Sequence, residues 1–143
     1  MKIKIPNWLM DIKYNGQIIP NNTNHNMTVT GANCQVFAYH LLRLHQFIVP
    51  EYRSSELWAD TEFSEVITEN FEPLDVLFFH KKNESYGAHV AVYLGDNQVV
   101  HLAKQVGKPV IWKMETFFEY PKYKFLLGAK RFYNKKCLKR KSV

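Results

Sequence analysis

One pair of segments in the middle of the chain constrains the fold more than any other. The runs Ala88–Leu94 and Gln98–Ala103 are both rich in apolar residues, and a Gly-Asp-Asn sequence separates them. Two such runs joined by a short turn of this composition are typical of a β-hairpin. Side chains alternate along a strand, so three of the apolar residues should share the core face. These are Val90, Val92 and Leu94.

The segment Ala32–Phe47 has a different periodicity. Its apolar residues recur at spacings of one, four and three, which favours a helix. Thr28, Thr30 or Asn33 could cap the start of this helix, and Pro50 lies beyond its end. A helix is therefore predicted before the hairpin.

The remaining elements indicate the fold class. A short helix is expected after Ser54 or Ser55, and a strand buried on both faces over Leu74–Phe79. Further strands are expected over Val110–Lys113 and Tyr123–Arg131. Helices come first and strands follow without regular alternation, which predicts an α+β fold with N-terminal helices packed on an antiparallel β-sheet.

Length and charge bound the domain organisation. The chain has 143 residues, which suits one domain, so we expect a single domain over 1–134 and a basic tail over 135–143. Without the five basic residues of that tail, 14 basic residues remain against 13 acidic ones. A nearly neutral body argues against a nucleic-acid-binding domain. The tail could contact RNA or acidic lipid, but a solvated terminus is the favoured interpretation.

The hairpin also brings two histidines together. If Leu94–Asp96 forms a three-residue loop, His89 lies directly opposite His101, with Cβ atoms about 5 Å apart. A two-residue loop would shift this pairing. Two adjacent imidazoles suit catalysis, because one can take a proton while the other holds its tautomer. A chance pair of half-exposed histidines is the alternative.

Cys34 is expected in or just before the first turn of the Ala32–Phe47 helix. A helix N-terminus stabilises a thiolate, and a nearby imidazolium would add to this, so a depressed thiol pKa is expected. A small buried apolar side chain is the alternative interpretation. The other cysteine, Cys137, lies in the basic tail, and neither cysteine has metal-ligand spacing.

Several segments match motifs of one enzyme family. His89–Gly95 reads HVAVYLG and resembles the His-Val-Gly-Ile-Tyr-Leu-Gly segment of the NlpC-type cell-wall peptidases, a papain-like superfamily of cysteine enzymes. His101 follows His89 by twelve positions, where that family often has a third polar residue. Pro73–Phe79 resembles the family's Pro-Gly-Asp-Leu-hydrophobic-Phe-Phe stretch, and Gly128–Arg131 resembles its Gly-Ala-Arg-Arg strand.

The segment around the cysteine departs from this family. The family usually reads Asp-Cys-Ser-Gly there, whereas this chain has Asn33, Cys34, Gln35 and Val36, so only the cysteine is kept. The family's upstream aromatic, which assists the oxyanion site, has no clear counterpart, and Asn22 lies where it would be sought.

The resemblance implies a cysteine peptidase or amidase that cleaves an amide or isopeptide bond in peptidoglycan-type peptides. Cys34 would be the nucleophile, His89 the general base and acid, and His101 the group that orients His89. The resemblance implies no metal or organic cofactor. Asn33 and Gln35 would contact substrate where the family holds a free amino group. An acyltransferase or deamidase on the same scaffold, or a non-catalytic papain-like binding module, are the alternatives.

The sequence also raises a question of location. It contains no long apolar stretch and no signal-peptide pattern, so the cytoplasm is the default expectation. A cell-wall substrate conflicts with that default. Four explanations stay open: recycling of wall fragments inside the cell, non-classical export, release with phage lysis, or a different substrate. The oligomeric state is left open as well.

Overall fold

A six-stranded sheet organises the structure. The computed structural model describes residues 3–21 and 26–134, and the strands follow the order β1-β6-β2-β3-β4-β5. They are β1 (Ser64–Ile67), β2 (Val76–His80), β3 (His89–Gly95), β4 (Gln98–Leu102), β5 (Pro109–Lys113) and β6 (Phe125–Phe132). The helices are η1 (Leu9–Asp11), α1 (Met27–Thr30), α2 (Cys34–Leu44), α3 (Ser54–Ala59), α4 (Met114–Phe117) and η2 (Pro121–Tyr123). Every neighbouring strand pair is antiparallel, which confirms the predicted α+β class.

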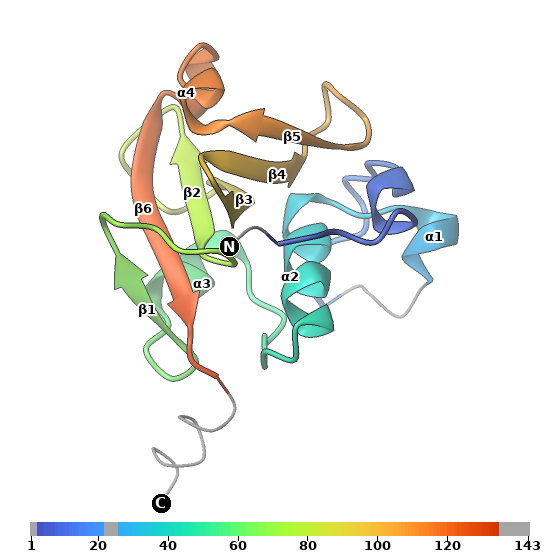
Figure 1. Cartoon of the computed structure of the whole chain (residues 1–143), viewed down its shortest axis with the longest axis horizontal. Helices are drawn as coiled ribbons and strands as arrows, with labels where there is room; N and C mark the ends of the chain where they lie inside the picture. Colours follow the sequence, from blue (N-terminus) through green and yellow to red (C-terminus); the bar gives the residue numbers. More distant parts are fainter. Residues whose placement is uncertain (1–2, 22–25, 135–143) are drawn as a thin grey trace, which may run out of the picture.

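Both faces of the sheet are covered with apolar side chains. Helix α2 packs against β3 and β4, with α1 farther from the sheet (Figure 1). The cluster on this side includes Phe37, Leu41, Val90, Val92 and Val100. A second cluster consists of Leu77, Phe79, Ala91, Val99, Phe117, Tyr123 and Ala129. The central strands therefore read as nearly continuous apolar runs, because they are buried on both sides.

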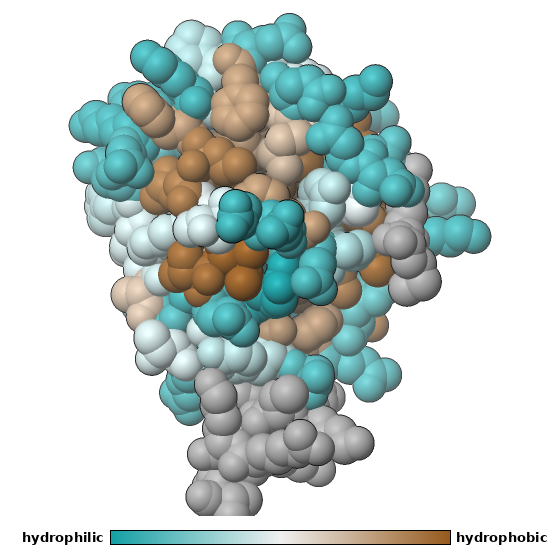
Figure 2. Space-filling view, turned by 60° about the vertical axis from the view of Figure 1, so that its left-hand side comes forward, coloured by the Kyte–Doolittle hydropathy of each residue, from teal (hydrophilic) through white to brown (hydrophobic). Residues whose placement is uncertain are grey.

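The side of the molecule that carries β1 and β6 is less completely covered. Apolar surface remains visible there between polar residues (Figure 2). Val66 in β1 and Phe125 in β6 are exposed. None of the described helices is long and apolar enough to cross a membrane.

The start of α2 agrees with the sequence prediction. Asn33 occupies the N-cap, and its side-chain oxygen accepts a 2.9 Å hydrogen bond from the Val36 N–H. This satisfies one of the N–H groups that a helix start leaves without a partner. Cys34 is consequently the first residue of the helix.

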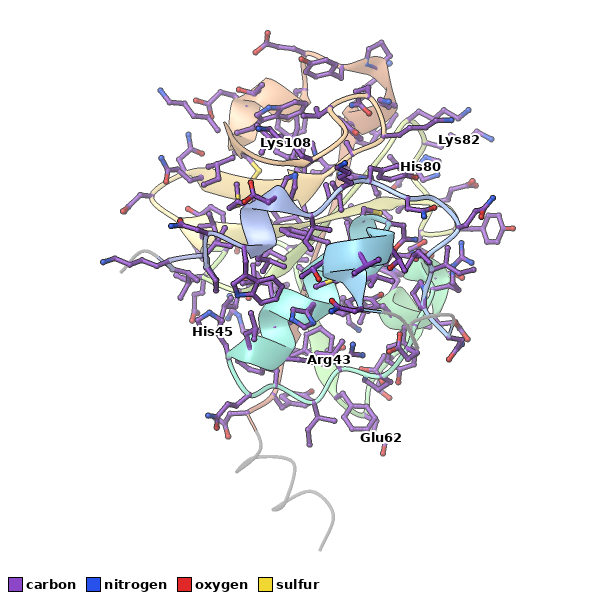
Figure 3. All side chains as sticks on the ribbon, turned by 90° about the vertical axis from the view of Figure 1, so that its right-hand side faces the viewer. Arg43, His45, Glu62, His80, Lys82 and Lys108 are labelled. Carbon is purple, nitrogen blue, oxygen red and sulfur yellow. The ribbon has the colours of Figure 1, made fainter. Side chains whose placement is uncertain are left out.

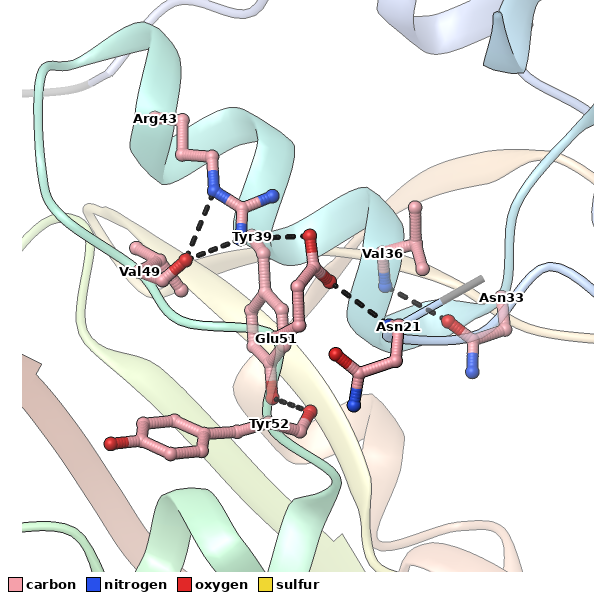
Figure 4. Close-up of polar contacts among 8 residues, drawn as sticks. All are labelled: Asn21, Asn33, Val36, Tyr39, Arg43, Val49, Glu51 and Tyr52. Atoms are coloured by element: carbon pink, nitrogen blue, oxygen red, sulfur yellow. Dashed lines mark hydrogen bonds and ion pairs between the residues drawn. The ribbon is translucent and has the colours of Figure 1, made fainter. Parts of the chain in front are cut away.

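The loop after α2 is tied back onto the helix (Figure 4). The Tyr39 hydroxyl donates to the Tyr52 carbonyl at 2.9 Å, and Arg43 Nε donates to the Val49 carbonyl at 3.1 Å. Arg43 also pairs with Glu51 at 3.3 Å. These contacts precede α3, whose first residues line a cavity together with Cys34.

The hairpin register differs from the predicted one. Asp96 and Asn97 adopt left-handed backbone angles (φ 52° and 63°), and Val92 pairs with Val100 after an irregularity between Tyr93 and Gly95. The turn is thus a two-residue turn with a bulge, and the prediction of direct opposition was wrong. Continuing the observed register by one residue places His101 opposite Ala91 instead of His89.

Other elements also differ from the sequence expectations. Helix α3 begins at Ser54, but Arg53 holds the N-cap and its N–H donates to Glu56 Oε1 at 2.8 Å, so no serine caps this helix. Strand β1 and the short helices α1 and α4 were not predicted. The predicted tail, 135–143, lies outside the described residues, so the domain boundary stays a prediction.

The N-terminal segment is fastened to the chain just before α2. The Asn15 N–H donates to the Ala32 carbonyl at 2.8 Å, and the Ala32 N–H donates to the Lys13 carbonyl at 3.0 Å. This approach requires glycine at position 31, where φ is +82° and a Cβ atom would collide with the Lys13 carbonyl oxygen. Tyr14, between these two contacts, is thereby held near the start of α2.

Candidate active site

The three residues predicted to be catalytic come from three different elements. Cys34 begins α2, His89 begins β3 and His101 lies in β4. Cys34 and His89 line the same cavity, which has a volume of about 320 Å³. Cys34 is half-buried, as is His89, so both remain accessible from this cavity. The structure therefore brings the thiol and the imidazole to one solvent-accessible space.

The two histidines are in contact although they are not directly opposite. His89 Nε2 lies 2.9 Å from His101 Nδ1, and the ring centroids are 5.1 Å apart. They form a diagonal pair on one face of the β3–β4 hairpin, a separation that long or aromatic side chains can span. The hydrogen bond holds the ring of His89 through its Nε2 atom. The Nδ1 atom of His89 takes no part in this bond.

The tautomer of His101 decides the direction of its hydrogen bond with His89. His101 is fully buried, and its Nε2 atom has no hydrogen-bond partner among the described residues. The rings of Trp112 and Phe117 lie 4.2 Å and 4.6 Å from it, centroid to centroid. With its hydrogen on Nε2, His101 presents a bare Nδ1 to His89. His101 Nδ1 then accepts from His89 Nε2–H, and His89 Nδ1 carries the free lone pair of a base.

Burial keeps the site neutral in its resting state. Desolvation lowers the pKa of His101 to about 3, with the Lys122 ammonium as a second cause. Desolvation also lowers the pKa of His89 well below its usual value, followed by repulsion from His101 and Lys122. The pKa of the Cys34 thiol is raised by burial, although backbone N–H groups of Val90 and Gln35 act against this. The expected depression of the thiol pKa is therefore wrong for the resting protein, because desolvation outweighs the helix N-terminus.

The lowered pKa of His101 predicts that acid destabilises the fold. The unfolded chain binds a proton near pH 6.5 that the folded chain accepts only near pH 3. The contribution of neutral His101 to the free energy of unfolding is thus complete above pH 6.5, and it is lost as the pH falls from there toward 3. The free energy of unfolding should decrease by up to about 1.4 kcal/mol per pH unit for this residue. Urea unfolding between pH 7 and 4.5 measures this slope.

The matched variants for that experiment are His101→Gln and His45→Gln. The first removes one buried titrating group and should reduce the slope, to which His89 also contributes, whereas exposed His45 provides the control substitution. Equal slopes for His101→Gln and the unmodified protein would contradict the prediction.

Tyr14 is a site residue that sequence reasoning missed. It lines the cavity with Cys34 and His89, and proximity to Cys34 contributes, after burial, to its raised pKa. Its N–H donates to the Gly107 carbonyl at 2.8 Å. Tyr14 lies twenty positions before Cys34, whereas Asn22, where an aromatic was sought, falls outside the described residues. The sequence does contain an aromatic residue upstream of Cys34. Its separation of twenty positions gave no local pattern to indicate that Tyr14 and Cys34 line one cavity.

A second cavity of about 360 Å³ also has Cys34 in its lining. Its lining includes Asn33, Gln35 and Arg53, together with residues of the loop before β3. Asn33 and Gln35 are both buried, and Asn33 Nδ2 donates to Gln35 Oε1 at 3.3 Å. The two residues predicted to contact substrate therefore lie beside the thiol, with the Asn33 oxygen already engaged in capping α2. Gly87 and Cys34 line both cavities.

Other polar residues serve the structure around the site. Asp75 is buried and accepts from Arg131 Nε and Nη2, each at 2.8 Å, which joins β6 to the turn before β2. His80, seen in Figure 3 near Lys82, accepts from the Lys82 N–H and contacts the Tyr86 carbonyl at 2.9 Å. Within residues 3–21 and 26–134, no cluster of three or more His, Cys, Asp or Glu residues could hold a metal ion.

Comparison with known proteins agrees with this architecture. The NlpC/P60 family profile matches residues 14–125, and no curated protein matches the chain. A crystal structure of an NlpC/P60 family protein from Bacillus cereus ATCC 10987 aligns with a TM-score of 0.55 and 23% sequence identity. That alignment covers 71% of this chain but 32% of the Bacillus protein, so this chain spans about a third of its relative's length. The family match extends over most of the chain, and the protein belongs to the NlpC/P60 family, with its papain-like α+β fold.

Proposed function

We propose that this protein is a cysteine peptidase or amidase that cleaves an amide or isopeptide bond in a peptidoglycan-type peptide. One observation carries the proposal: Cys34 and His89 line one cavity while His89 is held by its 2.9 Å contact with His101. NlpC/P60 membership supports a cysteine hydrolase acting on a peptide. No metal or organic cofactor takes part in the proposed reaction.

The acylation step uses the free lone pair of His89. His89 Nδ1 takes the Cys34 thiol proton, and the thiolate sulfur attacks the carbonyl carbon of the amide. The tetrahedral intermediate collapses when the carbon–nitrogen bond breaks and His89 returns the proton to the leaving amine. A thioester on Cys34 remains. His101 supports the transient charge on His89 through their hydrogen bond, without taking part in the bond changes.

Deacylation repeats this chemistry with water. His89 takes a proton from water as the hydroxide oxygen attacks the thioester carbon. The carbon–sulfur bond then breaks, the proton returns to the sulfur, and a carboxylic acid leaves. In both steps the negative oxygen can accept from the Cys34 backbone N–H at the start of α2 and from the Tyr14 hydroxyl.

The test is mass spectrometry of defined wall peptides incubated with the protein and with Cys34→Ala. Hydrolysis predicts two fragments whose masses together equal that of the peptide plus one water, formed only by the unmodified protein. Fragments joined to an added amine would show acyl transfer, and release of ammonia would show deamidation. Intact peptides with both proteins, or equal cleavage by both, would contradict the proposal.

Tyr14→Phe is expected to lower kcat by about a hundredfold, because it removes one hydrogen-bond donor to the oxyanion. KM should change little, since the lost interaction forms mainly in the transition state. Steady-state kinetics on a cleaved peptide measure both constants. The phenyl ring preserves packing, so the melting temperature should stay the same. An unchanged kcat in Tyr14→Phe would exclude the hydroxyl from the oxyanion site.

A further inference from the structure

We infer that the cavity between Trp8, Met27 and His40, the Trp8 cavity, binds an uncharged sugar ring of the N-acetylhexosamine class. This cavity has a volume of about 440 Å³, which is in the range of small-molecule sites. Neither Cys34 nor His89 lines it. The inference goes beyond the proposed function, because sugar binding can be measured there whether or not the protein cleaves a peptide.

Helix geometry separates the Trp8 cavity from the candidate active site. Its residues in α2 are Val36, His40 and Arg43, which are four and three positions apart and therefore share one side of the helix. At roughly 3.6 residues per turn, this side lies about half a turn around the helix axis from Cys34. Arg43 is seen in Figure 3, from the side of the molecule that carries α1 and α2. A ligand in the Trp8 cavity therefore lies apart from the thiol.

Trp8 offers an exposed flat ring to a ligand. It is 43% exposed, although tryptophan is highly buried on average in folded proteins. The His40 ring meets the indole edge-on, with ring centroids 5.4 Å apart and planes at 80°, and so supports its orientation. One face of a pyranose ring carries C–H groups, whereas its hydroxyl groups point outward from the ring edge. Such a ring can cover an indole face and still form hydrogen bonds around it.

The ionisable groups at the Trp8 cavity favour an uncharged ligand. Arg43 pairs with Glu51 at 3.3 Å, and its Nε donates to the Val49 carbonyl at 3.1 Å. Burial, followed by the Arg43 charge, lowers the pKa of His40, so its imidazole is neutral near pH 7. A neutral imidazole both donates and accepts a hydrogen bond, as a sugar hydroxyl does. A carboxylate or phosphate would instead require a cation that is not already paired.

Polar and apolar groups at the Trp8 cavity match an acetamido sugar. Asn26 Oδ1 accepts from the Thr28 N–H at 3.0 Å and from its hydroxyl at 2.6 Å, which orients the Asn26 side chain. Within the described residues, the Asn26 NH₂ group and the His40 ring nitrogens have no hydrogen-bond partner, so they are available to sugar oxygens. Ile18 and Met27 are buried and line the same cavity, where they provide apolar contact for the acetyl methyl group.

The experiment is an NMR titration with N,N′-diacetylchitobiose, and with maltose as a disaccharide without acetamido groups. The chain has three tryptophans, so three indole N–H signals are expected, and Trp8→Phe assigns that of Trp8. We expect diacetylchitobiose to shift the Trp8 signal but not those of Trp58 and Trp112, with a Kd of about 1 mM or less. Maltose should bind about tenfold more weakly or worse. An unshifted Trp8 signal, or equal affinity for the two sugars, would overturn the inference.

Two pairs of matched variants locate the binding, with calorimetry as the measurement. Trp8→Ala should weaken diacetylchitobiose binding by about tenfold or more, whereas Phe118→Ala removes an exposed aromatic ring outside the cavity and should leave Kd unchanged. His40→Gln and His45→Gln provide a second pair if Trp8→Ala does not fold. Only His40 lines the cavity, so only its replacement should weaken binding. Equal Kd values within each pair of folded variants would contradict the inference.

Blocking the thiol separates the Trp8 cavity from the candidate active site. The chain has two cysteines, so iodoacetamide can modify only Cys34 in the variant Cys137→Ser. Diacetylchitobiose should bind equally well before and after this modification, because Cys34 does not line the Trp8 cavity. Loss of binding after modification would assign the sugar to the candidate active site and overturn the inference. No measurement here uses cleavage, so a protein without peptidase activity would contradict the proposed function alone.

Discussion

Replacing His89 with alanine is expected to lower kcat/KM by about four orders of magnitude or more, the scale seen when a nucleophile loses its general base. Burial raises the pKa of the Cys34 thiol, so the thiolate does not form to a useful extent without a proton acceptor beside it. His89 lines the cavity that Cys34 lines, and its Nδ1 atom lies outside the contact with His101. Peptide cleavage followed by mass spectrometry measures the loss.

Alkylation of Cys34 provides a second readout that does not require a substrate. His89→Ala should slow the reaction of Cys34 with iodoacetamide near neutral pH, because the proposed acceptor of the thiol proton is then missing. His45→Ala serves as the matched control, since His45 is exposed at the end of α2 and far along the helix from Cys34. Activity of a folded His89→Ala protein within tenfold of the unmodified protein would contradict the assigned role.

Gly31→Ala is expected to reduce the free energy of unfolding by about 2–4 kcal/mol, which is a large fraction of the stability of a small domain. The backbone at Gly31 has φ +82° and ψ −169°, a region that essentially only glycine adopts. A Cβ atom there would also collide with the Lys13 carbonyl oxygen. To relieve the collision, the Lys13–Asn15 segment must move away from Ala32. This segment holds Tyr14 in the cavity. Urea unfolding measures the loss of stability.

Gly107→Ala is the control for the collision. Gly107 also has a positive φ, +87°, but a Cβ atom there would meet no other atom within 4 Å. This variant should lose only about 1 kcal/mol, the penalty for a left-handed alanine. A loss in Gly31→Ala no larger than in Gly107→Ala would show that the close approach of the N-terminal segment does not contribute to stability.

Local patterns in the sequence were sufficient for much of the fold. Apolar alternation on either side of Gly-Asp-Asn predicted the hairpin, and the structure has strands over His89–Gly95 and Gln98–Leu102. The helical spacing after three candidate caps, of which Asn33 is the one observed, predicted the start of α2 and placed Cys34 in or just before its first turn. These features depend on interactions between residues a few positions apart, which a single sequence displays directly.

The sequence therefore determined the class of fold, the element that carries each of Cys34, His89 and His101, and the resemblance to the NlpC-type peptidases. Only the tertiary structure decided the rest. The register depends on a two-residue turn and a bulge, so His89 meets His101 diagonally instead of directly across the hairpin. Tyr14 reaches the cavity through contacts between segments far apart in the chain. The direction of the Cys34 pKa shift depends on how completely other segments desolvate the thiol, and burial is a sum over the whole fold that no local pattern contains.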